Sequence, residues 1–297
     1  MAERLTRCPL CKSGHFLNYT EIKDFAVSKE NFLISKCETC KLLFTNPRPT
    51  PEEINPYYEF PEYYSHQDSS KNLTQWIYQI IRRYSINRKF KLIKKYKERG
   101  RILDYGCGTG EFLLKAKLNN WKTYGIEPNE KALTQANTKL NGKVFATIDS
   151  LKKDKLFDII TLFHVLEHVH ELRKTTKRLI SLVKENGYII IAVPNIESWD
   201  ATYYENYWAA WDVPRHLYHF NKNSINLFSE EFNLKLVDSK PMKFDSFYVS
   251  LLSEKYKNPK ISTVSNYILA FIQGMKSNMK AQKQGNYSSN IYIFQKK

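Results

Sequence analysis

The sequence predicts an α/β protein: a parallel sheet flanked by helices, preceded by a small metal-binding module. Three observations carry this prediction. From Arg101 onward, strand-like and helical segments alternate at short intervals, which is typical of a parallel sheet with helices on both faces. A glycine-rich turn follows the first of these strands. Four of the five cysteines form two Cys-x-x-Cys pairs within the first 40 residues, the usual spacing of a structural zinc site.

Length and charge limit the possible classes of protein. The 297 residues suffice for one large domain and a small module. No window approaches the roughly 18 apolar residues of a membrane span, and the polar start MAERLTRCPLCK is unlike an export signal, so we expect a cytoplasmic protein. The net charge of +16 favours an anionic partner, namely nucleic acid, a membrane surface or a phosphorylated substrate. A lysine-rich composition alone would give the same charge.

Residues 1–50 are predicted to form a zinc-ribbon-like module. Its metal ligands would be Cys8, Cys11, Cys37 and Cys40. Short apolar runs between the two pairs fit the strands of a hairpin. Four cysteines leave no open coordination position, so the zinc would be structural. The alternatives are disulfides, which a cytoplasmic location disfavours, or reduced thiols without an ion.

Residues 51–98 are predicted to be a tyrosine-rich linker followed by a basic helix. The segment Asn46-Pro-Arg-Pro-Thr-Pro51 interrupts regular structure. Apolar residues then recur at helical spacing over residues 72–98, among many lysines and arginines. Such a helix can contact an anionic membrane at the periphery of the bilayer. Alternatively, its apolar stripe belongs to the core and its charges are simply solvated.

The stretch ILDYGCGTGEFL predicts a cofactor loop. A strand ends at Asp104, and glycines then let backbone amides approach a ligand closely before a helix begins. The next strand ends in Glu127, where an acid can accept hydrogen bonds from ribose hydroxyls. Asp149 follows the third strand, where it can meet an adenine amino group. Cys107 is a small loop filler or a reactive thiol.

The run LDYGCGTGEFL…YGIEPNEKAL…FDIITLFHVLEHV…NGYIIIAVPN resembles the class I S-adenosylmethionine-dependent methyltransferases. Among these it is most similar to the small-molecule type, which includes ubiquinone-biosynthesis O-methyltransferases and bacterial sugar methyltransferases. The resemblance covers residues 99–297 and implies a Rossmann-like seven-stranded sheet ending in an antiparallel hairpin. Some sugar methyltransferases also carry a four-cysteine zinc module and a tyrosine-rich segment. They often have a further C-terminal domain, which we do not expect in this protein.

The resemblance implies a role for each cofactor residue. Asp104 and the loop formed by Gly106, Cys107, Gly108 and Gly110 would meet the methionine portion of S-adenosylmethionine. Glu127 would bind the ribose and Asp149 the adenine end. Phe163, at the end of FDIITLF, would face the cofactor and the acceptor.

An aromatic insert over residues 196–220 follows the strand GYIIIAVPN. Its aromatic residues are Trp199, Tyr203, Tyr204, Tyr207, Trp208, Trp211, Tyr218 and Phe220. They predict either a lid or platform for the acceptor or a satellite core under a long loop. Arg215 is a candidate for binding phosphate. His216 and His219 are candidates for the general base, or else packed histidines. A second insert, helical, is expected over about residues 243–287; its apolar faces could pack on the domain, meet a partner or bind lipid.

The stretch FHVLEHVH contains His-x-x-Glu-His, a zinc-peptidase pattern. It directly follows the fourth parallel strand, beside the expected cofactor, so peptidase chemistry is disfavoured. We expect a helix here, continuing through Val183. His164 becomes a third candidate base and His168 a weaker one. A low-affinity divalent ion near His164 and Glu167 is a further alternative.

These patterns favour a methyltransferase acting on an oxygen or carbon of a small-molecule, saccharide or lipid-linked acceptor. Its partners would be that acceptor and, as a candidate, an anionic membrane surface. An RNA methyltransferase is the alternative that the charge and zinc module support, but no Asn-Pro-Pro-Tyr motif follows FDIITLF. A non-catalytic binding module is the third hypothesis, and the intact glycine loop and acids oppose it.

Overall fold

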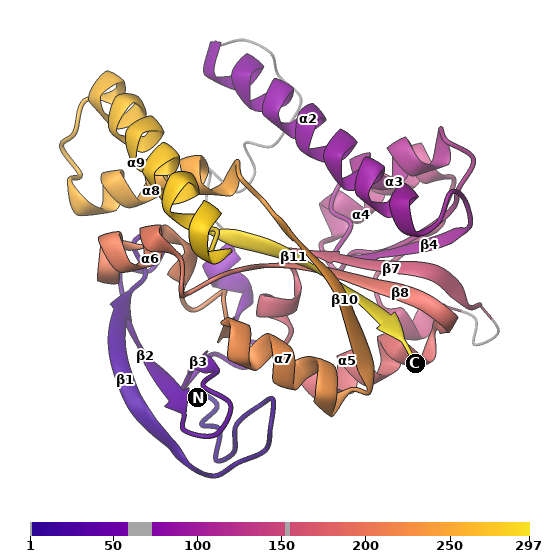
Figure 1. Cartoon of the computed structure of the whole chain (residues 1–297), viewed down its shortest axis with the longest axis horizontal. Coiled ribbons are helices and arrows are strands. Elements are labelled where there is room, and N and C mark those ends of the chain that lie inside the picture. Colours follow the sequence, from indigo (N-terminus) through magenta and orange to yellow (C-terminus); the bar gives the residue numbers. More distant parts are fainter. Residues whose placement is uncertain (1, 59–72, 152–154) are drawn as a thin grey trace.

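A seven-stranded sheet forms the centre of the molecule (Figure 1). The computed structural model describes residues 2–58, 73–151 and 155–297, with only the backbone of 73–81. The sheet order is β10-β11-β8-β7-β4-β5-β6, with strands β4 (Arg101–Tyr105), β5 (Lys122–Ile126), β6 (Val144–Phe145), β7 (Phe157–Phe163), β8 (Val183–Pro194), β10 (Leu234–Pro241) and β11 (Ser289–Lys296). Strands β4 to β8 are parallel, and β11 is antiparallel to both β8 and β10. The predicted α/β fold is confirmed.

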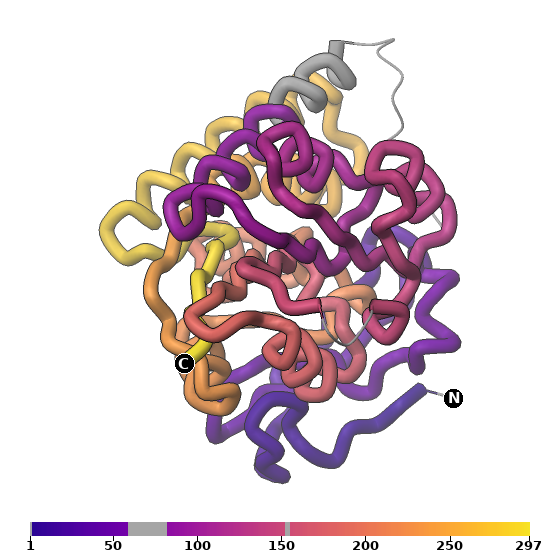
Figure 2. Tube along the Cα trace, turned by 90° about the vertical axis from the view of Figure 1, so that its right-hand side faces the viewer, coloured from indigo at the N-terminus to yellow at the C-terminus, as the bar shows by residue number. Residues whose placement is uncertain are grey.

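Helices cover both faces of this sheet because its strands are apolar on both sides. Consecutive residues such as Ile102 and Leu103 belong to different apolar clusters, as the alternation of side chains along a strand requires. One face carries α2 (Leu73–Tyr96), α3 (Glu111–Lys117) and α4 (Glu130–Leu140), and the other carries α5 (Leu172–Ser181) and α7 (Lys222–Glu231) (Figure 1). The N-terminal segment and α2 lie at opposite ends of the molecule in both views (Figure 2).

A second, four-stranded sheet joins the N-terminal segment to the aromatic insert. Its order is β1-β2-β3-β9, formed by β1 (Phe16–Lys23), β2 (Asn31–Cys37), β3 (Leu43–Thr45) and β9 (Tyr218–His219). In the last pairing, Phe44 lies opposite Tyr218. Because nothing in the sequence indicated this pairing, it is the main addition that the structure makes to the fold. The cysteine-bearing segment is therefore built into the molecule by hydrogen bonds as well as by packing.

The chain after β7 does not form the expected helix. His164 has a φ of +58°, which turns the chain sharply away from the strand. Residues Leu166–His168 form the short 3-10 helix η3, and α5 begins only at Leu172 and ends at Ser181. The prediction of a continuous helix through Val183 is therefore wrong, since Val183 is already the first residue of β8.

The remaining elements cluster around the carboxyl ends of the parallel strands and the N-terminal sheet. They are η1 (Asn55–Tyr58), η2 (Ile148–Ser150), α6 (Trp199–Tyr204), η4 (Glu205–Tyr207), η5 (Ala209–Trp211), α8 (Asp245–Lys257) and α9 (Thr263–Gln284). Within the described parts of the chain, no helix combines the length and apolar character needed to cross a membrane. In the tyrosine-rich linker, residues 59–72 lie outside the described residues.

Candidate functional site

The glycine loop after β4 leaves space for a ligand. Gly106 and Gly108 have φ values of +75° and +54°, which favour glycine. A Cβ on Gly106 would lie 2.5 Å from Val165 Cγ2, whereas one on Gly108 would meet nothing within 4 Å. The loop is thus packed at its start and open at its centre. Gly110 follows as the residue before α3.

Cys107 points into the sheet rather than into this open space. A Cβ built on Gly125 of β5 would lie 2.6 Å from Cys107 Sγ, so the thiol occupies the room that the glycine leaves. Burial raises the pKa of Cys107 above its ordinary value. A buried thiol that holds its proton is a poor nucleophile, which favours the loop-filler interpretation.

Two buried acids support the loop. Asp104 accepts a hydrogen bond from Thr161 Oγ1 on β7 at 2.6 Å. Burial raises the pKa of Asp104 to about 7 despite that hydrogen bond. The carboxylate of Glu127 accepts from the backbone N–H groups of Gly108 (2.8 Å) and Asn129 (2.9 Å). Glu127 therefore fixes the shape of the loop as well as standing at the end of β5.

Asp149 lies further out than the other acids. Strand β6 has only two residues, and Asp149 follows it in η2 with a side chain that is 87% exposed. Its Oδ1 lies 3.9 Å from Arg178 Nε. This position is at the edge of the sheet, on the far side of β5 from Asp104.

Helix α2 contributes a lysine that the sequence did not single out. Lys89 Nζ lies 4.3 Å from the ring centroid of Phe163, at the end of β7. Burial lowers the pKa of Lys89, while Asp245 and Asp104 counteract the shift. An amino group thus stands among the strand ends beside the loop. Lys89 is one of many basic residues on α2, so only its position in the fold distinguishes it.

His164 is held between two carboxylates. Its Nδ1 lies 3.3 Å from Glu167 Oε1 and its Nε2 lies 3.0 Å from Asp245 Oδ2. Burial opposes its charged form, but the hydrogen bonds to Asp245 and Glu167 raise the pKa of His164 to about 9. With both ring nitrogens engaged and protonated near neutral pH, His164 is better suited to positioning its neighbours than to accepting a proton.

Beyond His164 lies a buried cluster formed by Glu167, His168 and His216. Each offers one oxygen or nitrogen atom, and these atoms lie within 4.8 Å of one another. His168 Nδ1 lies 2.9 Å from the carbonyl oxygen of Arg215, and His216 Nδ1 lies 2.9 Å from that of Ala210. A carbonyl only accepts, so both Nδ1 atoms carry a hydrogen, and in a neutral ring the lone pair is then on Nε2.

Glu167 gives this cluster its negative charge. Its side chain is fully buried, and among the described residues Oε2 has no hydrogen-bond partner. Burial opposes ionisation, but the hydrogen bond from His164 and the positive charge of that ring hold the pKa of Glu167 below its ordinary value. Burial lowers the pKa of His168 to about 4. The cluster can accept a proton, and its three donor atoms are also of the kind that bind a divalent cation.

The aromatic insert mostly forms a core rather than a platform. Trp208, Trp211 and Tyr204 are buried and pack with Ile22 and Ile34 of the N-terminal sheet. His219 is buried too, and its ring contacts Trp211 edge-on at 4.9 Å between centroids. Burial lowers the pKa of His219 well below its ordinary value. The satellite-core alternative therefore describes most of this segment.

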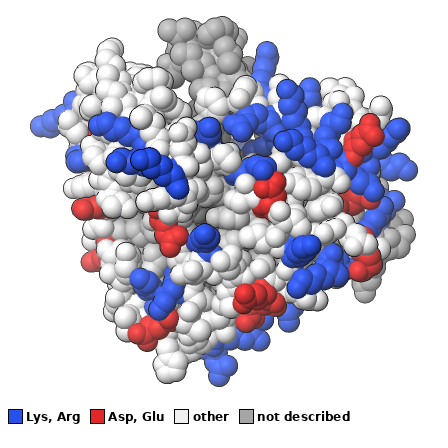
Figure 3. All heavy atoms as spheres, viewed as in Figure 1, with Lys and Arg blue, Asp and Glu red and all other residues white. Residues whose placement is uncertain are grey.

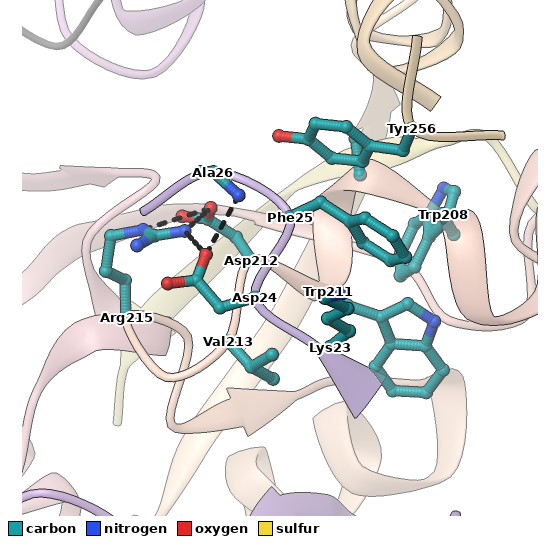
Figure 4. A pocket seen from close by; sticks show the side chains of 11 residues that line it. Lys23, Asp24, Phe25, Ala26, Trp208, Trp211, Asp212, Val213, Arg215 and Tyr256 are labelled. Atoms are coloured by element: carbon teal, nitrogen blue, oxygen red, sulfur yellow. Dashed lines mark hydrogen bonds and ion pairs between the residues drawn. The ribbon is translucent and has the colours of Figure 1, made fainter. Parts of the chain in front are cut away.

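Arg215 is used inside the molecule. Its Nη2 lies 2.7 Å from Asp212 Oδ1 and 3.1 Å from Asp24 Oδ1, and Nη1 donates to the carbonyl of Tyr57 at 2.9 Å. Figure 4 shows this pair of carboxylates on the guanidinium at the edge of a small pocket that Phe25 and the insert tryptophans line. The two carboxylates already neutralise the positive charge that would attract a phosphate, which disfavours the phosphate-binding role. Arg215 instead links Asp24 of the N-terminal segment to Asp212 of the insert.

The four cysteines lie together near the N-terminus. Cys8 Sγ is 3.5 Å from Cys40 Sγ, Cys11 Sγ is 3.5 Å from Cys37 Sγ, and none is in a disulfide. A tetrahedral ion with Zn–S bonds of about 2.3 Å separates its sulfurs by a little under 4 Å, so the arrangement fits such an ion. The shared hydrogen bond lowers the pKa of Cys8 to about 5 and raises that of Cys40, and burial raises that of Cys11 to about 11. Metals bind the thiolate form, so binding of the ion would release protons from these thiols.

Comparison with known proteins places this geometry in a family. A family described as a methyltransferase domain matches residues 78–239. The ubiquinone biosynthesis O-methyltransferases of Rickettsia felis and Rickettsia akari are 31% and 30% identical to the chain over 100 and 101 residues. These matches cover 32% of this chain and about two-fifths of each relative (41% and 40%).

Among solved structures, the magnesium protoporphyrin IX methyltransferase of Synechocystis, with bound SAH, superposes with a TM-score of 0.50. The superposition covers 78% of this chain and 91% of that one. The sequence identity is 14%, so this likeness concerns the fold.

Proposed function

Because the chain belongs to the class I S-adenosylmethionine-dependent methyltransferases, we propose that it methylates an oxygen or carbon of a small-molecule, saccharide or lipid-linked acceptor. The O-methyltransferase names of the Rickettsia relatives support an oxygen acceptor. When bound, S-adenosylmethionine supplies an electrophilic methyl group. The protein must then align the acceptor and, for a hydroxyl or an acidic carbon, take up its proton.

The cofactor would lie along the carboxyl ends of β4 and β5. The open centre of the loop at Gly108, the buried carboxylate of Asp104 and the anchored carboxylate of Glu127 fit the two ends of a ligand with a cationic amino group and ribose hydroxyls. Phe163 would contact it from β7, and Asp149 would meet its adenine end from the edge of the sheet.

One observation carries the choice of base: His216 Nδ1 donates to the carbonyl of Ala210, so the lone pair of the neutral ring is on Nε2. One nitrogen of this ring lies within 4.8 Å of a carboxylate oxygen of Glu167. Nε2 can therefore take a proton from the acceptor, and the carboxylates of Glu167 and Asp212 would stabilise the resulting cation. Asp212 Oδ2 lies 3.9 Å from His216 Nε2. In the same proposal, His164 positions Glu167, and His219 is a packing residue.

The test is methyl transfer from labelled S-adenosylmethionine into an extract of cells that lack the protein, followed by separation of lipids, polar small molecules and RNA. Label in the lipid or polar fraction is the expected result. His216→Gln should lower transfer by about a hundredfold or more while binding of S-adenosylhomocysteine is retained. The matched control is His15→Gln, which changes an exposed histidine far from His216 in the sequence. It should behave as the wild type.

Two results would count against the proposal. Label confined to RNA would support the RNA methyltransferase instead, in which case binding should weaken steeply with salt. Full activity of His216→Gln would remove the base from His216 without affecting the methyltransferase assignment.

We also propose that Cys8, Cys11, Cys37 and Cys40 hold a structural zinc ion. Three of the four are buried in a core that continues into the aromatic insert. All four donors are thiols, so the ion would have no position left for a substrate. Its contribution would be to fix the two Cys-x-x-Cys turns against β9.

A further inference from the structure

Helix α9 has an amphipathic pattern that is the reverse of the usual one. Its buried face consists of small and polar residues, namely Ala270, Gln273, Gly274, Ser277, Asn278 and Ala281. An ordinary surface helix buries its large apolar residues. The polar face is nevertheless well fitted: Ser277 Oγ donates to the buried Asp200 at 2.7 Å. Gly274 allows a close approach, because a Cβ there would lie 2.5 Å from the ring of Phe247 on α8.

The large apolar residues of α9 point away from the protein. We call them the α9 stripe: Val264, Tyr267, Ile268, Phe271, Ile272, Met275 and Met279. Val264, Phe271 and Met279 are 69%, 61% and 62% exposed. Their spacing of three or four residues places them along one side of the helix over four turns, roughly 22 Å. These seven make up almost half of the sixteen exposed large apolar side chains among the described residues.

A row of aromatic rings extends the α9 stripe towards α2. Phe271 stacks on Phe247 of α8 at 5.7 Å between centroids. Phe247 is 6.3 Å from Phe244, which in turn contacts Tyr84 of α2 edge-on at 5.0 Å. Figure 1 shows α9, α8 and α2 at the same end of the molecule. A chain of aromatic contacts therefore connects the α9 stripe with the basic helix α2.

Positive charge borders this surface. From Lys255 to the last residue the sequence has eight lysines and no aspartate or glutamate. Helical spacing places Lys276, Lys280 and Lys283 along one edge of the α9 stripe. At its other end, Arg88 of α2 lies over the ring of Tyr84. Among the charged side chains in the upper part of Figure 3, lysines and arginines outnumber acids, and they gather most densely at the upper right.

These features favour a lipid surface over a second copy of the chain. In a two-fold contact the same patch meets itself, so the lysines of one copy would face those of the other. No acidic residue lies beyond Glu254 in the sequence to pair with them. An anionic bilayer instead accepts apolar side chains below its headgroups and attracts the lysines at the headgroup level.

We propose that the α9 stripe inserts into the interface of an anionic bilayer, with α9 lying in the plane of the membrane. Helix α8 connects this surface to the site, since Asp245 at its start contacts His164 Nε2 at 3.0 Å. Docking would bring the cluster of Glu167, His168 and His216 close to the bilayer, where a lipid-linked acceptor resides. That last step rests on the proposed methyl transfer, whereas docking itself does not.

Flotation of the full chain with vesicles tests the proposal. Vesicles of phosphatidylcholine are compared with vesicles in which about a third of the lipid is phosphatidylglycerol. The wild type should float with the anionic vesicles. Phe271→Ser with Met279→Ser should reduce the bound fraction about tenfold or more, and Lys276→Glu with Lys280→Glu should do so for the anionic vesicles.

The controls make the same changes elsewhere. Leu118→Ser alters a 74% exposed leucine after α3. Lys222→Glu with Lys235→Glu removes two exposed lysines on α7 and β10. Both control variants should float as the wild type does. Calorimetry with S-adenosylhomocysteine shows that each variant keeps a folded site. Equal flotation of wild type and α9 variants would overturn the proposal, as would a wild-type dimer that the Phe271 and Met279 changes convert to a monomer.

Discussion

Asp104 and His164 stand at neighbouring strand ends, and their surroundings shift their pKa values for different reasons. Asp104 is buried with one hydrogen bond from Thr161, so desolvation dominates and its pKa rises to about 7. His164 meets two carboxylates, so attraction overcomes desolvation and its pKa rises to about 9. Both shifts lead to tests that single substitutions can make.

Replacement of Asp104 by asparagine should stabilise the cofactor-free protein increasingly as the pH rises from about 4 to about 7. The unfolded carboxyl loses its proton near 3.8, but the folded one holds it to about 7. Within that window the folded state binds more protons, so its stability falls with rising pH. Urea unfolding should show the difference from Asp104→Asn growing to a few kcal/mol at most. A difference independent of pH would contradict the raised pKa.

The ion pair between His164 and Asp245 should stabilise the protein below neutral pH. The pKa of His164 is 6.5 ordinarily and about 9 here, so its contribution is complete below the first value and disappears as the pH rises through the second. Asp245→Asn should therefore lower the free energy of unfolding by about 1 kcal/mol or more near pH 6 and much less near pH 10. In this variant, the pKa of His164 measured by NMR titration should move towards its ordinary value. An unchanged midpoint of the titration would exclude Asp245 as the cause of the raised pKa.

At the scale of elements, the pairing of β3 with β9 connects the cysteine segment to the aromatic insert. Leu43 lies opposite His219 and Phe44 opposite Tyr218, so an ion held by the cysteines would stabilise the strand next to the proposed base. The hydrogen bond from Thr45 Oγ1 to the carbonyl oxygen of His216, at 2.8 Å, connects the two directly.

Loss of the proposed zinc should therefore affect the insert as well as the N-terminus. Cys37→Ser should reduce the bound metal, measured by mass spectrometry, and lower the free energy of unfolding by several kcal/mol. Cys107→Ser, outside the cluster, is the control for metal content. Purified wild type without zinc, or a Cys37→Ser variant with unchanged unfolding, would contradict the structural zinc site.

At the scale of the whole molecule, one apolar core extends from the cysteine segment to the sheet. Leu10 and Phe44 belong to the same buried cluster as Leu217, Phe228 and Phe294. The apolar surface buried between the cysteine segment and the sheet domain stabilises the folded protein, and neither part would bury it alone.

Removal of residues 1–50 should consequently give an insoluble or loosely packed protein, because Leu217 and Tyr218 would become exposed. The full-length variant Phe44→Ala tests the same core and should cost about 3–5 kcal/mol in urea unfolding. Leu17→Ala, at a 55% exposed residue of β1, is the control. A soluble, cooperatively unfolding truncation would show that the sheet domain is independent of the N-terminal segment.

The sequence by itself determined the α/β class, the strand before Asp104 and the cysteine pairs, because local periodicity and spacing encode these features. It could not determine the shape of FHVLEHVH, where a turn at His164 with φ +58° replaced the expected helix. The tertiary structure also decided which histidines lie beside the buried Glu167, which basic residue of α2 reaches the loop, and which face of α9 is exposed. Each of these depends on contacts between segments far apart in the chain, and local propensity carries no information about such contacts.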